Sequence, residues 1–163
     1  MLEFDRRPLD RDPLRGFALD WTEDLTLLQV MEDQQFRLNG YTVFRNADVK
    51  QWRTVGPDEF SAKAAKLHRL RPMAPAGLRY SSMQEAALTA GAAFPLITIH
   101  QERLDRNVCF VGKVERVTRR RVTILPISPA GNWETKREHY EIADITRIDF
   151  GGAYETLLAR MGG

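Results

Sequence analysis

From residue 16 to residue 55, short runs of β-branched and aromatic residues alternate with polar turns. The clearest turns are residues 22–24, residues 32–34 and the pair Asn39-Gly40. Asn-Gly favours a two-residue hairpin, because both central positions of that turn need a positive φ. The pattern predicts three or four antiparallel strands over residues 16–53, within a first β unit of residues 16–55.

The segment before this unit has a different texture. Pro8 and Pro13 stand among alternating charges, and few apolar residues are available for burial. We expect residues 1–15 to form an extended N-terminal arm.

Residues 56–93 have a helical pattern. Phe60, Ala64 and Leu67 recur at i, i+4 and i+7, the stripe of an amphipathic helix. Further on, Ser82 and Glu85 have the spacing of a capping box, and a short apolar run follows. We expect two helices here, forming a helical connection between two β units.

The β texture returns from Phe94 onward, in the runs PLITIHQ, VCFVGKVERV, RVTILPI and HYEIADITRIDF. The valines around Gly112 do not alternate strictly, which predicts a bulge or a strong bend there. A terminal helix is expected at the end, with four apolar residues on one face: Tyr154, Leu157, Leu158 and Met161. Residues 94–163 are therefore expected to form a second β-barrel unit with a C-terminal helix.

Two stretches repeat one plan. Gly16 opens GFALDWT and Gly112 opens GKVERVT; each stretch passes through a hairpin to a tyrosine, Tyr41 or Tyr140, and then to an Ala-Asp-aliphatic triplet. The matching positions that follow are Trp52 and Ile148. We interpret this as an internal duplication and predict an α+β, mainly β fold: two related, small, strongly bent antiparallel β-barrel units, packed as one compact structure.

The duplication also predicts where two of the three tryptophans lie. Trp21 matches Val117 and Trp52 matches Ile148, both apolar positions of the second unit. We therefore expect Trp21 and Trp52 to pack in a core.

The stretch from Gly112 to Tyr154 has the pattern G-x-V-x-x-V-T, V-T-I-L, then Y-x-I-x-D-I-T-R-I-D-F-G-G-x-Y. This pattern, with a weaker match at GYTVFR, resembles an uncharacterised family of bacterial proteins built on Sm-like or SH3-like small β-barrels. The resemblance implies the fold and no established activity. Sm-like barrels often bind RNA as rings, but this chain lacks the loop Asn and the Arg-Gly or Lys-Gly pair of their RNA pocket.

The composition is that of a folded globular protein, with 43% apolar and 28% charged residues in 163. No apolar run approaches the ~20 residues of a membrane span, and the first 15 residues are charged where a signal peptide is apolar. We expect a soluble, cytoplasmic protein that does not enter a membrane. The net charge of +2 is divided unevenly, as −4 over residues 1–60 and +6 over residues 61–163.

No catalytic constellation is visible in the sequence. His68, His100 and His139 lie far apart and have no neighbours at metal-ligand spacing. Cys109 is the only cysteine and lies in an apolar run, which predicts a buried, structural side chain. We therefore predict no metal site, no cofactor and no catalytic residue.

Two groups of residues are candidates for contact with a partner. The first is the tip of a predicted hairpin, and the second is a polar loop in which a tryptophan is either exposed or folded back onto its own unit. The six residues are Arg119, Arg120, Arg121, Trp133, Lys136 and Arg137.

Three functional hypotheses remain open at this point. The leading one is a non-catalytic binding or assembly module, with a protein or a second copy of itself as partner. The second is a nucleic-acid binder, most readily of RNA, that uses these six residues on a basic face of the second barrel. The third is an enzyme or small-ligand protein with a site between the two barrels.

Overall fold

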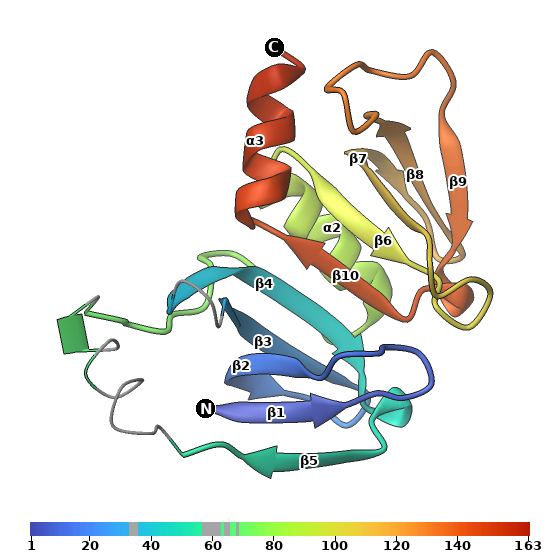
Figure 1. Ribbon diagram of the computed structural model, residues 1–163. Helices are drawn as coiled ribbons and strands as arrows, with labels where there is room; N and C mark the ends of the chain where they lie inside the picture. Colours follow the sequence, from blue (N-terminus) through green and yellow to red (C-terminus); the bar gives the residue numbers. More distant parts are fainter. Residues whose placement is uncertain (33–35, 57–62, 64–65, 68) are drawn as a thin grey trace.

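A computed structural model describes residues 1–32, 36–56, 63, 66–67 and 69–163 (Figure 1). Ten strands form one antiparallel sheet in the order β5-β1-β2-β3-β4-β10-β6-β7-β8-β9. The strands are β1 (Leu2–Asp5), β2 (Leu14–Trp21), β3 (Leu25–Glu32), β4 (Arg37–Arg45), β5 (Gln51–Thr54), β6 (Ile97–His100), β7 (Cys109–Val117), β8 (Arg121–Pro126), β9 (Glu138–Glu141) and β10 (Arg147–Phe150). The helices are α2 (Met83–Ala93), α3 (Ala153–Met161) and the 3₁₀ turns η1 (Asn46–Asp48) and η2 (Ile142–Asp144).

The sheet consists of two halves that repeat one strand order. We call β1 to β5 the first half and β6 to β10 the second half. Their orders are β5-β1-β2-β3-β4 and β10-β6-β7-β8-β9, and each half has a 3₁₀ turn before its last strand. At the paired positions of β2 to β5, a residue corresponds to the one 96 positions later, as Gly16 does to Gly112 and Trp52 to Ile148.

Backbone hydrogen bonds also recur at this spacing of 96 residues. The Thr22 amide donates to the Leu25 carbonyl at 2.8 Å, and the Thr118 amide donates to the Arg121 carbonyl at 2.8 Å. The strand register equates Tyr140 with Phe44, so the expected match between Tyr140 and Tyr41 is wrong by three positions.

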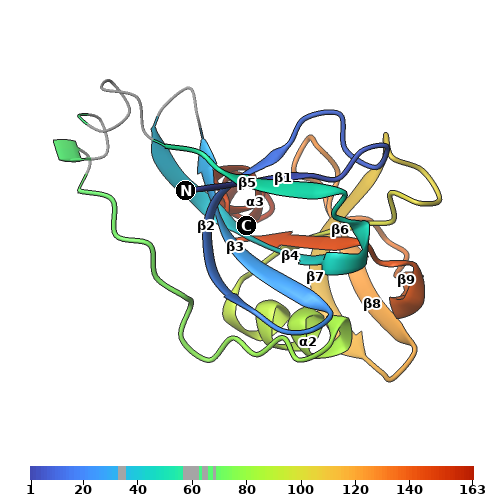
Figure 2. The same ribbon diagram turned by 90° about the horizontal axis from the view of Figure 1, so that it is seen from below.

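The expectation of two closed barrels is wrong. Closure of the first half would place β4 next to β5, but β4 pairs with β10 of the second half, with Val43 opposite Ile148. This pairing joins the halves into one open sheet and leaves β5 and β9 as its edges (Figures 1 and 2).

Residues 1–15, expected to form an arm, contribute β1 to the interior of the sheet, between β2 and β5. Phe4 is buried there, and the carboxylate of Glu3 accepts hydrogen bonds from Arg15 and Arg53 on the two neighbouring strands, both at 2.7 Å. The charges that made this segment look like an arm are thus paired across strands.

A glycine allows the second strand of each half to bend. A Cβ atom on Gly16 would lie 2.1 Å from the Gln29 carbonyl oxygen, and one on Gly112 would lie 2.5 Å from the Leu125 carbonyl oxygen. A register shift follows each glycine, and in β7 it falls between Val114 and Arg116. The bend expected near Gly112 therefore has a counterpart in β2.

Helix α2 covers the second half. As the capping box predicts, the Ser82 hydroxyl accepts a hydrogen bond from the Glu85 amide. The helix buries Ala86, Ala87 and Ala90 in a core that includes the inner residues of the second half. The close approach requires small residues, because a Cβ atom on Gly91 would lie 2.5 Å from Cβ of Val114.

The other predicted helices differ from expectation or lie outside the description. The helix expected from Phe60 and Ala64 falls on residues outside the described ranges, although Leu67 is described and exposed. In α3 the expected apolar face is divided: Leu158 is buried, whereas Tyr154, Leu157 and Met161 are exposed.

Candidate functional site

The first half contains an open apolar hollow of about 470 Å³. We call it the first-half hollow. It is lined by Leu2, Phe4, Ala18, Trp21, Thr26, Asn46, Val49 and Trp52.

Five of the eight counterparts of these residues are buried in the core of the second half, and Val114, Val117 and Ile142 pack against that core while partly buried. In the order of their first-half equivalents they are Ile97, Ile99, Val114, Val117, Val122, Ile142, Ile145 and Ile148. The same core contains the alanines of α2 and three residues on the outer side of the first half: Leu25, Leu27 and Val43. The space over the inner face is filled in the second half and open in the first half. No helix among the described residues covers the first-half hollow.

The two tryptophans at the mouth of the hollow are exposed, so the prediction that they pack in a core is wrong. Trp21 is 69% exposed and Trp52 is 63% exposed. The reason is the position of the strands. Ile148 lies between Val43 on β4 and Ile99 on β6, whereas Trp52 lies on the edge strand β5 and pairs with β1 alone.

Two polar residues of the hollow already have partners. The Asn46 amide nitrogen donates to the carbonyl oxygens of Thr22 and Glu23 at 3.0 and 2.9 Å, and the Thr26 hydroxyl donates to the Asn46 oxygen at 2.7 Å. These bonds hold the 3₁₀ turn η1 against the β2–β3 turn. The remaining surface of the hollow is apolar, and it suits an apolar ligand.

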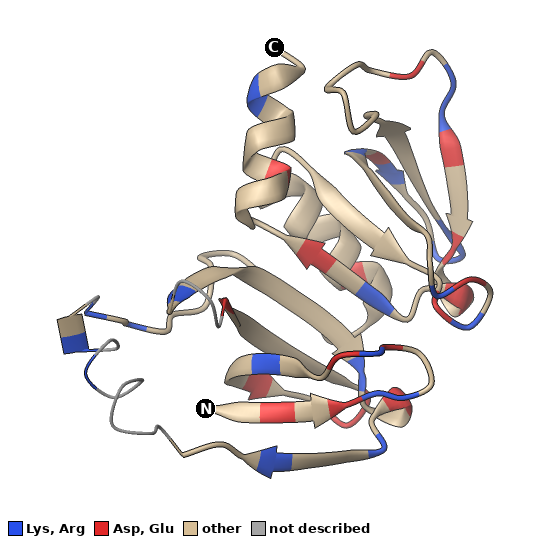
Figure 3. Ribbon diagram, viewed as in Figure 1, with Lys and Arg blue, Asp and Glu red and all other residues tan. Residues whose placement is uncertain are grey.

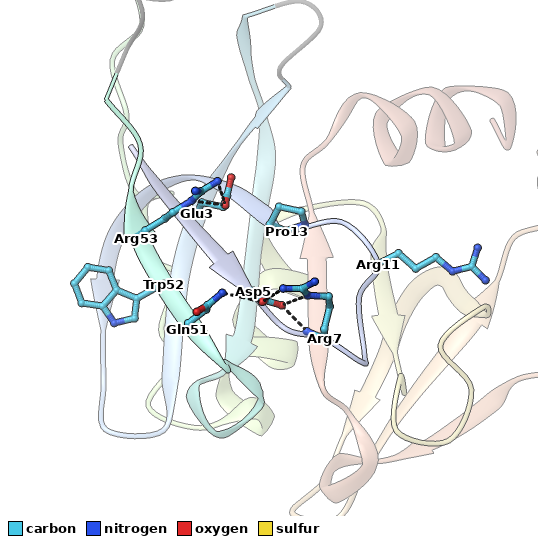
Figure 4. A pocket seen from close by; sticks show the side chains of 8 residues that line it. All are labelled: Glu3, Asp5, Arg7, Arg11, Pro13, Gln51, Trp52 and Arg53. Atoms are coloured by element: carbon cyan, nitrogen blue, oxygen red, sulfur yellow. Dashed lines mark hydrogen bonds and ion pairs between the residues drawn. The ribbon is translucent and has the colours of Figure 1, made fainter.

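The opposite face of β1 and β5 is polar and lines a second cleft of about 490 Å³ (Figure 4). There the Asp5 carboxylate accepts hydrogen bonds from Arg7, which lower its pKa. Desolvation raises the pKa of Glu3, but hydrogen bonds from Arg15 and Arg53 outweigh it and lower the pKa. Figure 4 shows these paired charges with the ring of Trp52 directed away from them.

A buried ionic cluster connects the two halves. The Arg6 side chain is fully buried, and its guanidinium donates to both oxygens of Glu102 at 3.2 and 2.5 Å. Arg147 lies within 3.4 Å of the same carboxylate and 2.9 Å from Asp10. Desolvation raises the pKa of Glu102, but Arg6 and Arg147 outweigh it and lower the pKa.

The histidine in this cluster is held by charged neighbours. Nε2 of His100 lies 2.8 Å from the Asp149 carboxylate, and Arg147 lies 3.2 Å from both ring nitrogens. Cys109 is the register partner of His100 and is exposed, so the prediction of a buried cysteine is wrong. Among the described residues, no group of His, Cys, Asp or Glu could hold a metal ion.

The predicted contact residues fall into two separate groups. Arg119 and Arg120 lie in the β7–β8 turn and Arg121 begins β8. Trp133, Lys136 and Arg137 lie in the β8–β9 loop at the other end of β8. A six-residue strand is about 20 Å long, so the structure does not bring the groups together.

Several of these side chains have partners within the second half. Arg121 forms an ion pair with Glu141, and Arg137 forms one with Glu115. Figure 3 shows acidic residues interleaved with basic ones over β7, β8 and β9. The charges of Arg121 and Arg137 are thus paired with acidic residues of the same half.

Trp133 folds back onto its own half, which was one of the two alternatives left open. It is half-buried, its Nε1 donates to the Gly162 carbonyl at 2.9 Å, and it packs against Ile127 and Leu158.

The chain matches no protein-family profile, no curated protein and no solved structure. Within the described residues, no helix is long and apolar enough to cross a membrane.

The first-half hollow was missed by the sequence reasoning, although a signal was present. Two positions that are apolar in the second half, Val122 and Ile142, are polar in the first, as Thr26 and Asn46. Such a difference between repeats indicates that one inner face is sealed and the other is open.

Proposed function

We propose that this protein is a non-catalytic binding module whose first-half hollow receives an apolar helical segment of a protein partner. One observation carries the proposal: all eight residues that line the hollow have counterparts that are buried in, or pack against, the core of the second half. Exposed apolar surface that collects in a concave site is typical of an interaction surface.

The internal comparison also indicates which kind of ligand fits. In the second half the equivalent space is covered by α2, whose buried face is mostly alanine. Trp21 and Trp52 stand at the mouth of the hollow, and aromatic residues in such positions contribute most to protein binding. A helix with an apolar face therefore suits the hollow better than a polar or charged ligand.

A peptide taken from this chain provides a probe. We expect an acetylated, helix-stapled peptide with the sequence of residues 82–94 to bind, and to shift the fluorescence of Trp21 and Trp52 to shorter wavelength. Loss of a central aromatic residue costs about 2 kcal/mol or more, so Trp52→Ser should weaken binding roughly 30-fold. Fluorescence titration measures both effects.

The matched control is Leu104→Ser, which alters an exposed apolar residue outside the hollow and should leave the affinity unchanged. The proposal fails if no binding occurs at about 1 mM peptide, where the binding free energy is near −4 kcal/mol. It also fails if Trp52→Ser binds the peptide as tightly as the unaltered chain.

A further inference from the structure

We propose that the first-half hollow of one copy receives helix α3 of a second copy. This inference rests on the proposed function and names the partner. It starts from the second apolar surface that the molecule exposes, which lies on α3.

Helix α3 carries an apolar stripe on its exposed side. Tyr154, Leu157 and Met161 are 50%, 58% and 51% exposed, and their spacing of three and four residues places them on one face. The side of the helix that flanks this stripe is anchored, because Leu158 is buried and Glu155 accepts a hydrogen bond from the Thr98 hydroxyl at 2.6 Å. The helix is thus fixed to the sheet with its stripe facing outward.

Helix α3 cannot reach the first-half hollow of its own chain. Figure 1 shows α3 at one end of the molecule and β1, β2 and β5 at the other. Filling the hollow with α3 therefore requires a second copy.

The sizes of the two surfaces match. From Tyr154 to Met161 the stripe extends about 10 Å along two helical turns, which suits a site of this volume. In the second half, Gly91 of α2 lies against Val114, whereas the first half has the smaller Ala18 at that position. At this position the first half therefore has more room than the second for a side chain larger than alanine, such as those on α3.

The charges beside the stripe of α3 and beside the hollow are also opposite in sign. They favour binding of α3 to the first half rather than to the second. Arg160 follows Leu157 by three residues and is exposed beside the stripe. The β2–β3 turn next to Trp21 is acidic, with exposed Asp20, Glu23 and Asp24. The corresponding turn of the second half is basic, because its equivalent residues are Arg116, Arg119 and Arg120.

The contact joins two different surfaces. It can form reciprocally in a two-fold dimer, or it can be repeated head to tail, in which case the copies close into a larger ring or continue as an open chain. In both cases the mass of the assembly exceeds that of one chain and depends on the protein concentration.

Sedimentation equilibrium of the full chain tests the proposal. We expect association that increases with concentration, and we expect Leu157→Ser and Trp52→Ser each to weaken it at least tenfold, about 1.4 kcal/mol. Leu104→Ser again serves as the control, and far-UV circular dichroism establishes that each variant is folded. A chain that stays monomeric at about 1 mM, where a contact of −4 kcal/mol would be half-formed, overturns the inference.

A charge exchange gives a second, independent readout. Arg160→Glu and Asp24→Arg should each weaken association, and their combination should restore part of it, since the opposite charges then face each other again. Weakening without any restoration in the double variant argues against this pairing of surfaces.

The two proposals can fail separately. A chain that binds the peptide of residues 82–94 but does not self-associate refutes the inference and leaves the proposed function standing. A chain that does neither refutes both.

Discussion

Replacement of Glu102 by alanine is expected to lower the free energy of unfolding by about 3–5 kcal/mol, the range found when one partner of a buried ion pair is removed. The carboxylate is 3% exposed and lies 2.5 Å from a guanidinium nitrogen of Arg6, whose side chain is fully buried. Without Glu102, a positive charge remains in the interior, with Asp10 at its partly exposed edge as the partner that is left. Urea denaturation followed by circular dichroism measures the change.

The exposed acid Glu134 is the matched control, and Glu134→Ala should change stability by less than about 0.5 kcal/mol. A double replacement of Arg6 and Glu102 by methionine should cost less than Glu102→Ala, because no buried charge of this pair is then left alone. Equal stability of Glu102→Ala and the unaltered chain would show that the cluster does not join the halves energetically.

The buried carboxylate of Glu102 should also make the free energy of unfolding depend on pH. Its pKa is lowered by the arginines in the folded chain, so its contribution to stability is complete above the unfolded pKa of about 4.5. The contribution is lost as the pH falls through the lower folded pKa. Free energies of unfolding measured between pH 7 and pH 3 should therefore decline below about 4.5, and less steeply in Glu102→Gln.

Gly16→Ala is expected to have the second-largest effect, a loss of about 1–3 kcal/mol or more. The added Cβ atom would lie 2.1 Å from the Gln29 carbonyl oxygen, which is part of the backbone of β3. A flexible side chain could move aside, but a paired strand cannot do so without breaking its register. The loss is measured as a lower midpoint of urea denaturation.

Gly56→Ala provides the comparison, because a Cβ atom there meets nothing within 4 Å. If Gly16→Ala and Gly56→Ala have the same stability, then the bend of β2 does not depend on glycine at position 16.

Some local elements were predictable from the sequence, but the hairpin turn predicted at Asn39-Gly40 is wrong, because both residues lie within β4 at a shift of its register with β3. The cap at Ser82 and the bulge near Gly112 follow from short motifs, and both are present. The sheet as a whole was not predictable in this way. Whether β4 pairs with β5 or with β10 depends on contacts about 100 residues apart in sequence, which no local pattern reports.

The candidate site was harder to predict for a related reason. Trp52 and Ile148 are equivalent in the repeat, but one lies on an edge and the other between two strands. Equivalent positions in a duplicated chain thus have unequal burial, and only the order of the strands reveals which copy is exposed.

The outer face of the second half is polar, whereas the outer face of the first half is apolar. In the first half, Leu25, Leu27 and Val43 pack against the inner face of the next unit, but their counterparts are Arg121, Thr123 and His139. Arg121 is paired with Glu141 and Thr123 with His139, so that surface is satisfied by water and by its own neighbours. A further repeat would therefore find no apolar surface there against which to pack, unlike the surface that the first half offers to the second.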